Sequence, residues 1–150
     1  DDIRVRQVPV LESMPIGRFR DEYVWSPTNE LPMYGGFEKT AWQQEADEKF
    51  LARMRRDFDG DLETAAERFA QMGWNFYYQG DRAKAIKRFN QAWLLNADNQ
   101  HALWGFAVIS RDRGKFEDAL RYYEGALEQE PAPEKLRQEY GQLRSPGNDN

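Results

Sequence analysis

The 150-residue sequence contains no cysteine and a single histidine, His101. These absences exclude a disulfide framework, thiolate catalysis and a Cys-ligated zinc site, and they argue against a histidine-based metal site. No apolar run approaches the roughly 18 residues that a membrane-spanning helix needs. Acidic residues outnumber basic ones by 26 to 21, and the net charge of −5 argues against a nucleic-acid partner. We therefore expect a non-enzymatic protein with no cofactor, no metal site and no transmembrane segment.

The composition of the chain changes near Gly35 and Gly36. Residues 1–36 hold four prolines and almost no helical periodicity, which predicts an extended N-terminal arm or linker with room for one short strand. The arm has too many apolar residues for a purely solvated tail, so we expect part of it to lie against the folded body. Residues 37–144 are expected to form a helical domain, and residues 145–150 a polar tail.

Helix-capping and helix-breaking residues divide the helical domain into segments. Asp61 is a good N-cap for one helix, Gly80 closes that helix, and Pro131 follows the end of a later one. Between these marks, apolar residues recur with helical spacing. The expected helices cover about residues 39–57, 62–79, 82–96, 100–113, 116–130 and 134–143.

The sequence repeats itself when it is shifted by 34 residues. The shift aligns Gly80 with Gly114, Ala85 with Ala119, Phe89 with Tyr123, Ala92 with Ala126 and Phe69 with Leu103. Small residues at fixed offsets are expected where two helix backbones come close, and bulky ones where they fill the space between neighbouring pairs. The glycine after the first helix of each pair supplies a left-handed backbone conformation that ends the helix.

This pattern resembles the tetratricopeptide repeat family. Phe69-x-x-Met72-Gly73-x-x-Phe76 stands where the family has W-x-x-L-G-x-x-Y. Ala85-x-x-x-Phe89-x-x-Ala92 and Ala119-x-x-x-Tyr123-x-x-Ala126 match its A-x-x-x-F-x-x-A segment, and Pro131 matches its closing proline. The departures from the pattern are Ala97, in place of the closing proline of the first repeat, and Ser110, in place of the aromatic residue of the second.

The resemblance implies an all-α fold of antiparallel helix-turn-helix repeats, with one unit at about residues 66–99 and a second at about 100–133. Two repeats leave apolar faces bare at both ends. We therefore expect the helices at about 39–57 and 134–143 to cap the first and the second repeat. The last helix is expected to have a solvated outer face made by Glu134, Lys135, Arg137, Gln138 and Glu139.

The resemblance also implies that the first helices of the repeats line a concave surface, on which the family binds peptides. Phe69, Met72 and Phe76 are expected to face the core on the other side. The groove-facing positions are expected to be Glu67, Ala70, Gln71, Trp74, Tyr77 and Tyr78 in the first repeat, and His101, Trp104, Gly105, Val108, Arg111 and Asp112 in the second. Tryptophan and tyrosine dominate binding hot spots. The predicted partner-binding residues are Trp74, Tyr77, Tyr78, His101, Trp104, Val108 and Arg111.

The two indoles have an alternative explanation, in which Trp74 and Trp104 pack against the N-terminal arm or the flanking helices. Both explanations hold if the arm occupies the groove until a partner displaces it. Some family members hold a partner's C-terminal carboxylate with Lys, Asn and Arg. The matching positions here carry Ala70, Trp74 and Gly105, so this clamp is absent.

The expected function is that of a small adaptor or scaffold, a protein–protein interaction module that binds a peptide segment of another protein in an aromatic-rich concave groove. Self-association into a homo-oligomer stays open. The alternative is an exported or lipid-anchored bacterial assembly factor, a secretion chaperone or an immunity-type protein that masks a partner. In that case residues 1–36 would form the tether. An exported or periplasmic location is slightly favoured over the cytoplasm, although no motif in the sequence is diagnostic of export.

Overall fold

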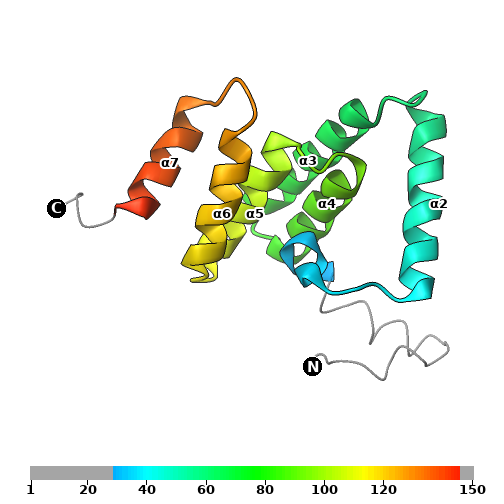
Figure 1. The fold of residues 1–150 in the computed structure, drawn as a ribbon, viewed down its shortest axis with the longest axis horizontal. Coiled ribbons are helices and arrows are strands. Elements are labelled where there is room, and N and C mark those ends of the chain that lie inside the picture. Colours follow the sequence, from blue (N-terminus) through cyan, green and yellow to red (C-terminus); the bar gives the residue numbers. More distant parts are fainter. Residues whose placement is uncertain (1–28, 146–150) are drawn as a thin grey trace.

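The computed structural model describes residues 29–145, and this part of the chain is all-α, with no strand (Figure 1). It confirms the expected fold class. The possible strand and most of the N-terminal arm fall in residues 1–28, outside the described residues. The elements are η2 (Pro32–Gly36), α2 (Ala41–Asp57), α3 (Leu62–Tyr78), α4 (Arg82–Leu95), α5 (Gln100–Asp112), α6 (Phe116–Leu127) and α7 (Glu134–Arg144).

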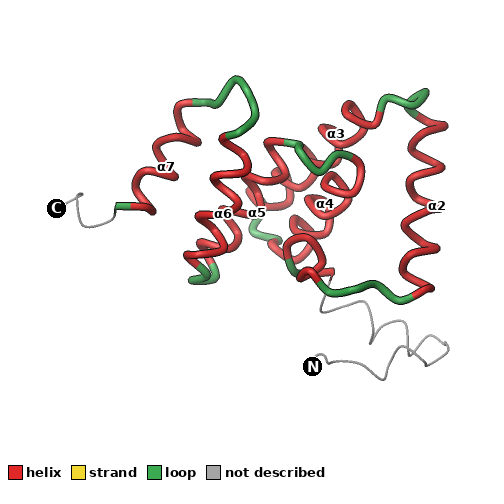
Figure 2. The backbone as a smooth tube through the Cα atoms, viewed as in Figure 1, coloured by secondary structure: helices red, strands yellow, loops and turns green. Residues whose placement is uncertain are grey.

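The helices form antiparallel pairs that stack side by side. The most extensive contacts join α3 to α4 and α5 to α6, and the two pairs meet where α5 packs on both α3 and α4 (Figure 2). Each pair turns through a glycine with positive φ, Gly80 at 87° and Gly114 at 79°. Asp61 and Asn99 cap the first helix of each pair, because their side chains accept hydrogen bonds from the first turn. This architecture is the one that the 34-residue register predicts.

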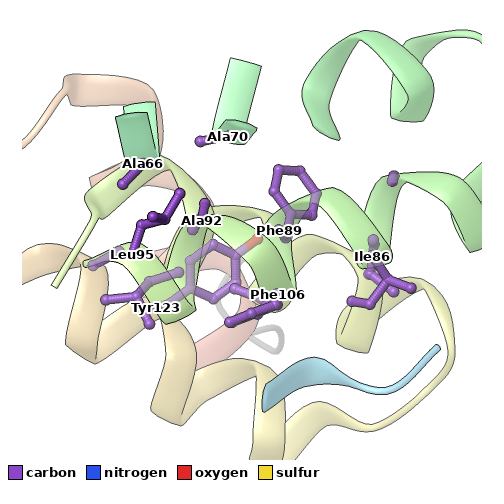
Figure 3. Close-up of a cluster of buried hydrophobic side chains, with 14 of the residues drawn as sticks. Ala66, Ala70, Ile86, Phe89, Ala92, Leu95, Phe106 and Tyr123 are labelled. Carbon is purple, nitrogen blue, oxygen red and sulfur yellow. The ribbon is translucent and has the colours of Figure 1, made fainter. Parts of the chain in front are cut away.

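Phe89 of α4 is at the centre of the core (Figure 3). Its ring packs between the backbones of Gly73 in α3 and Gly105 in α5, each of which is so close that a Cβ atom there would overlap it. Ala85 and Ala119 are fully buried, in keeping with their place in the repeat. The small residues therefore let three helices approach a single aromatic ring.

Helix α2 covers the first repeat only in part. Phe50 packs edge-on against Phe69 of α3, with ring centroids 5.4 Å apart, and Met54 is buried. Apart from these contacts α2 lies away from the α3–α4 pair (Figure 1). Met72 of α3 is 37% exposed, and the expectation that it faces the core is wrong.

At the other end, α7 packs against α6 and buries Leu136 completely. The chain leaves α6 at Leu127, three residues before the expected end, and the side-chain amide of Gln100 donates to carbonyls of Ala126, Gln129 and Pro131 there. The first four residues of the expected solvated face of α7 are exposed, whereas Glu139 is half-buried. The expectation for Glu139 is wrong, because its carboxylate points into the fold and accepts hydrogen bonds there.

The described part of the N-terminal arm packs on α4. The side-chain amide of Asn90 donates to the carbonyl of Leu31 over 2.9 Å, and Arg113 donates to the carbonyl of Glu30 over 3.0 Å. The ring of Tyr34 lies 6.4 Å from that of Trp93. Residues 29–36 therefore cover the second helix of the first repeat and leave the inner surface of α3 and α5 uncovered.

Candidate functional site

The predicted partner-binding residues surround one hollow, of about 380 Å³, on the inner surface of α3, α5 and α7. Residues three or four positions apart share a helix face, so the side chains of each helix meet there. The described lining consists of Gln71, Trp74, Tyr77 and Tyr78 from α3, His101, Trp104, Val108 and Arg111 from α5, and Lys135 and Glu139 from α7. All seven predicted residues are in this set.

Trp74 is the centre of an aromatic surface in the hollow. Its ring centroid lies 5.4 Å from that of Tyr77, 5.6 Å from that of Tyr78 and 6.0 Å from that of Trp104. His101 stacks on Trp104, with ring centroids 6.3 Å apart and an interplanar angle of 14°. These separations fall within the range of favourable aromatic pairs. Tyr78 is 74% exposed, so the surface is open on its side.

Both indoles also tie successive inner helices together. The Nε1–H of Trp74 donates to the carbonyl of His101 over 3.0 Å, which links α3 to the start of α5. The Nε1–H of Trp104 donates to Oε1 of Glu139 over 2.8 Å, which links α5 to α7. The alternative explanation is therefore partly right, because Trp104 packs against a flanking helix. Both indoles nevertheless line the hollow, and their orientations are fixed.

A partly buried hydrogen-bond network adjoins Trp104. Arg111 donates to the hydroxyl of Tyr123 over 3.1 Å, and that hydroxyl donates to Glu139 over 3.0 Å. Burial, together with the nearby Glu139 carboxylate, raises the pKa of Tyr123 well above its usual range. Burial acts to lower the pKa of the Arg111 guanidinium. The electrostatic interactions with Tyr123, Asp112 and Glu139 raise this pKa by more than burial lowers it. The network holds one cation and one anion at the edge of the hollow.

Asp112, at the end of α5, lies beside Arg111, whose Nη2 atom is 3.5 Å from Oδ1 of Asp112. It accepts from the hydroxyl of Tyr77 over 2.7 Å and from Arg82 over 3.1 Å. Burial and the hydrogen bond to Asp112 raise the pKa of Tyr77. Asp112 thus holds Tyr77, which lines the hollow, in place. Asp112 is not itself among the lining residues.

Glu67 was expected to face the groove, and the structure places it against the start of α5. Its carboxylate accepts from Gln71 over 2.8 Å and from Asn99 over 3.1 Å, and it lies 2.9 Å from Nδ1 of His101. Burial acts to raise the pKa of Glu67, but the hydrogen bonds from Gln71, His101 and Asn99 lower it further than burial raises it. Glu67 therefore positions His101 from outside the lining set.

Three residues expected at the groove are buried. Ala70 is completely buried, and Gly105 faces the Phe89 ring. Both lie where α3 and α5 meet neighbouring helices, so the expectation that they face the groove is wrong. Val108 does line the hollow, but only 3% of it is exposed. It serves as part of the floor.

Two lining residues, Lys135 and Glu139, were missed as groove residues because α7 lies beyond the two recognised repeats. Continuing the 34-residue shift would have found Lys135, which it aligns with His101, but it aligns Glu139 with the buried Gly105 and so gives no signal for Glu139. Helix α7 thus takes the place that the first helix of a third repeat would have. Within residues 29–145, no three His, Cys, Asp or Glu side chains gather as metal ligands, and no helix is both long and apolar enough to cross a membrane.

Comparison with known proteins bears on the fold. Residues 76–134 match the sequence profile of the tetratricopeptide repeat. Over 60 residues the chain is 32% identical to a TPR repeat-containing protein of Methanocaldococcus jannaschii, in a match that covers 40% of this chain and 11% of that protein. No solved structure matches the chain significantly. The matched residues form helices that pair and stack with the period read from the sequence, so this part of the chain is similar to tetratricopeptide repeats in both sequence and fold.

Proposed function

We propose that this protein is a non-enzymatic adaptor that binds a peptide segment of a partner protein in the hollow between α3, α5 and α7. Tetratricopeptide repeats are a non-catalytic fold that mediates protein–protein interaction. The observation that supports this particular surface is the convergence of aromatic side chains from α3 and α5 on one open hollow of about 380 Å³. This volume lies within the range of about 300–1,000 Å³ that is typical of ligand-binding pockets.

The hollow is pre-organised for binding. Hydrogen bonds fix the indoles of Trp74 and Trp104, so these side chains lose little rotamer freedom when a ligand covers them. Tyr78 is largely exposed, and its ring lies tilted by 32° against that of Trp74 and nearly perpendicular to that of Tyr77. A partner that covers Tyr78 removes its ring from water, which is the kind of contact that makes a hot spot.

The chemistry of the lining favours an apolar side chain at the centre of the ligand. Arg111 and Glu139 are already hydrogen-bonded to Tyr123 and lie 3.8 Å from each other, so most of their charge is balanced within the protein. Most of the remaining lining is aromatic or apolar, while Gln71 and the exposed Lys135 add polar groups. We therefore expect the bound segment to place an aromatic or aliphatic residue on Trp74 and Trp104, with polar groups at the rim.

The test uses peptides selected on the full chain from a random display library. Binding is followed through the indole N–H signals in NMR spectra, because tryptophans at several places in the fold act as separate reporters. We expect selected peptides to shift the signals of Trp74 and Trp104 and to leave those of Trp42 and Trp93 in place. Peptides that bind while the Trp74 and Trp104 signals stay unchanged would refute the proposal.

The matched variants are Tyr78→Ala and Phe116→Ala. Each removes an exposed aromatic ring, but only Tyr78 lines the hollow. Loss of a hot-spot ring costs about 2 kcal/mol or more, so the dissociation constant of Tyr78→Ala should rise by roughly 30-fold. The Phe116→Ala variant should bind as the wild type does. Tyr78 is a better choice than Trp74, whose contact with Phe89 couples it to stability.

A further inference from the structure

A second cleft, of about 470 Å³, lies between α2, η2 and α4. None of its lining residues belongs to the hollow between α3, α5 and α7. Helix α2 lies away from the α3–α4 pair (Figure 1), and the cleft is lined by residues of α2 and α4 and by Tyr34 of η2. It is therefore a separate surface, on the second helix of the first repeat, and its chemistry can be considered independently.

The charge of this cleft is opposite to that of the chain. Five of its described lining residues are cationic, namely Lys39, Arg53, Lys84, Lys87 and Arg88, and only Asp47 is acidic. Asp47 is hydrogen-bonded to Lys39, which also lies over the ring of Tyr34. Lys84 pairs with Asp81, with Nζ and Oδ2 3.8 Å apart, and this exposed pair neutralises little charge. A chain with a net charge of −5 thus concentrates positive charge in one place.

The same cleft also presents aromatic side chains. Trp42 of α2 is 46% exposed. Phe50, about two helical turns further along α2, is half-buried against Phe69. Arg53 lies over the Phe50 ring, with its guanidinium carbon 6.0 Å from the ring centroid. Cationic and aromatic side chains therefore line the same cleft, so that one bound ligand can contact both kinds.

We propose that this cleft binds an acidic peptide segment of a partner protein. The carboxylates of the bound segment would pair with Arg53, Lys84 and Arg88. An apolar side chain of the same segment would cover Trp42 and Phe50. Positive charge inside an otherwise acidic surface focuses the electrostatic field on the cleft and steers a short anionic segment into it. A long polyanion such as a nucleic acid meets the acidic surface beyond the cleft, which disfavours it.

The test measures fluorescence anisotropy of a labelled peptide in which glutamates surround a leucine and a phenylalanine, added to the full chain. The control peptide replaces every glutamate with glutamine. We expect the acidic peptide to bind, to weaken steeply as salt rises, and to bind at least tenfold more tightly than the control peptide. Equal affinity of the two peptides, or no binding of the acidic one, overturns the proposal.

The variant for this test is the double charge reversal Lys84→Glu with Arg88→Glu. Its matched control is Lys115→Glu with Arg121→Glu, which makes the same change in net charge on α6 and the turn before it, outside both lining sets. We expect the first pair to raise the dissociation constant at least tenfold and the second to change it less than threefold. Wild-type affinity in the first pair overturns the proposal.

The indole signals distinguish this site from the concave hollow. We expect the acidic peptide to shift the signal of Trp42 and to leave those of Trp74 and Trp104 unchanged. Shifts confined to Trp74 and Trp104 overturn the cleft proposal and leave the proposed function standing. Tighter binding of a single-stranded oligothymidylate than of the acidic peptide, at equal salt, also overturns it.

Discussion

The contact between Gly105 and Phe89 allows a sharp test of the packing. A Cβ atom on Gly105 would lie 2.4 Å from two carbons of the Phe89 ring and 2.7 Å from a third. The ring cannot retreat, because at its opposite edge a Cβ atom on Gly73 would already lie 2.6 Å from Cδ1 and Cε1. The ring also packs steeply inclined to those of Trp74 and Phe106, with ring centroids 5.5 and 6.3 Å from its own. Gly105→Ala must therefore move several side chains or a helix.

Two opposing terms set the size of the effect. Alanine is favoured over glycine inside a helix by about 1 kcal/mol. Overpacking a well-filled core costs about 1–3 kcal/mol, and the upper part of that range applies because the clash is severe and enclosed. We therefore expect Gly105→Ala to lower the free energy of unfolding by about 1–2 kcal/mol, although the same change in an open helix would raise it.

The assay is urea unfolding followed by far-UV circular dichroism, with two comparisons. Gly141→Ala in α7 meets open space, so it should gain up to about 1 kcal/mol from helix propensity alone. In a Phe89→Leu background the obstructing ring is gone, and Gly105→Ala should no longer destabilise. If Gly105→Ala is as stable as the wild type or more so, the account of a ring held between two glycine backbones is refuted.

Three further predictions concern polar groups. Gln100→Ala removes an amide that holds three carbonyls around the end of α6, so it should cost about 1–2 kcal/mol and weaken amide-exchange protection there; unchanged protection would contradict this. The pKa of Glu67 is lowered, so the stability it contributes is present above the ordinary carboxyl pKa and lost as pH falls through the folded-state pKa. Glu67→Gln should therefore lose less stability on acidification than the wild type, measured by thermal melts. The pKa of Tyr123 is raised, so its contribution holds below about pH 10 and is lost as pH rises further. Tyr123→Phe should cost about 1–3 kcal/mol at neutral pH and show a flatter alkaline limb in the same melts.

The 34-residue register was sufficient to predict the paired helices, because the small residues and the turn glycines are local requirements of close helix packing. The predicted binding residues lie at one hollow, because residues three or four positions apart on a helix share the same face. The register could not show that Ala70 and Gly105 face neighbouring helices, because a small residue is compatible with either environment. Glu139 was assigned to a solvated face for a similar reason, since its partners Trp104 and Tyr123 lie on other helices and are far away in sequence.

The core and the hollow share a wall, and this gives Gly105→Ala a second expected result. Trp74 packs edge-on against Phe89 behind it and lines the hollow in front, while its indole is held by the carbonyl of His101. A displaced Phe89 ring must therefore move the Trp74 indole. We expect Gly105→Ala to shift the Trp74 indole signal, to leave that of Trp42 in place and to weaken binding of peptides selected on the wild type, whereas Gly141→Ala changes none of these. If stability falls while the Trp74 signal and peptide affinity stay as in the wild type, the packing of the core does not set the shape of the hollow, and the pre-organisation argument fails.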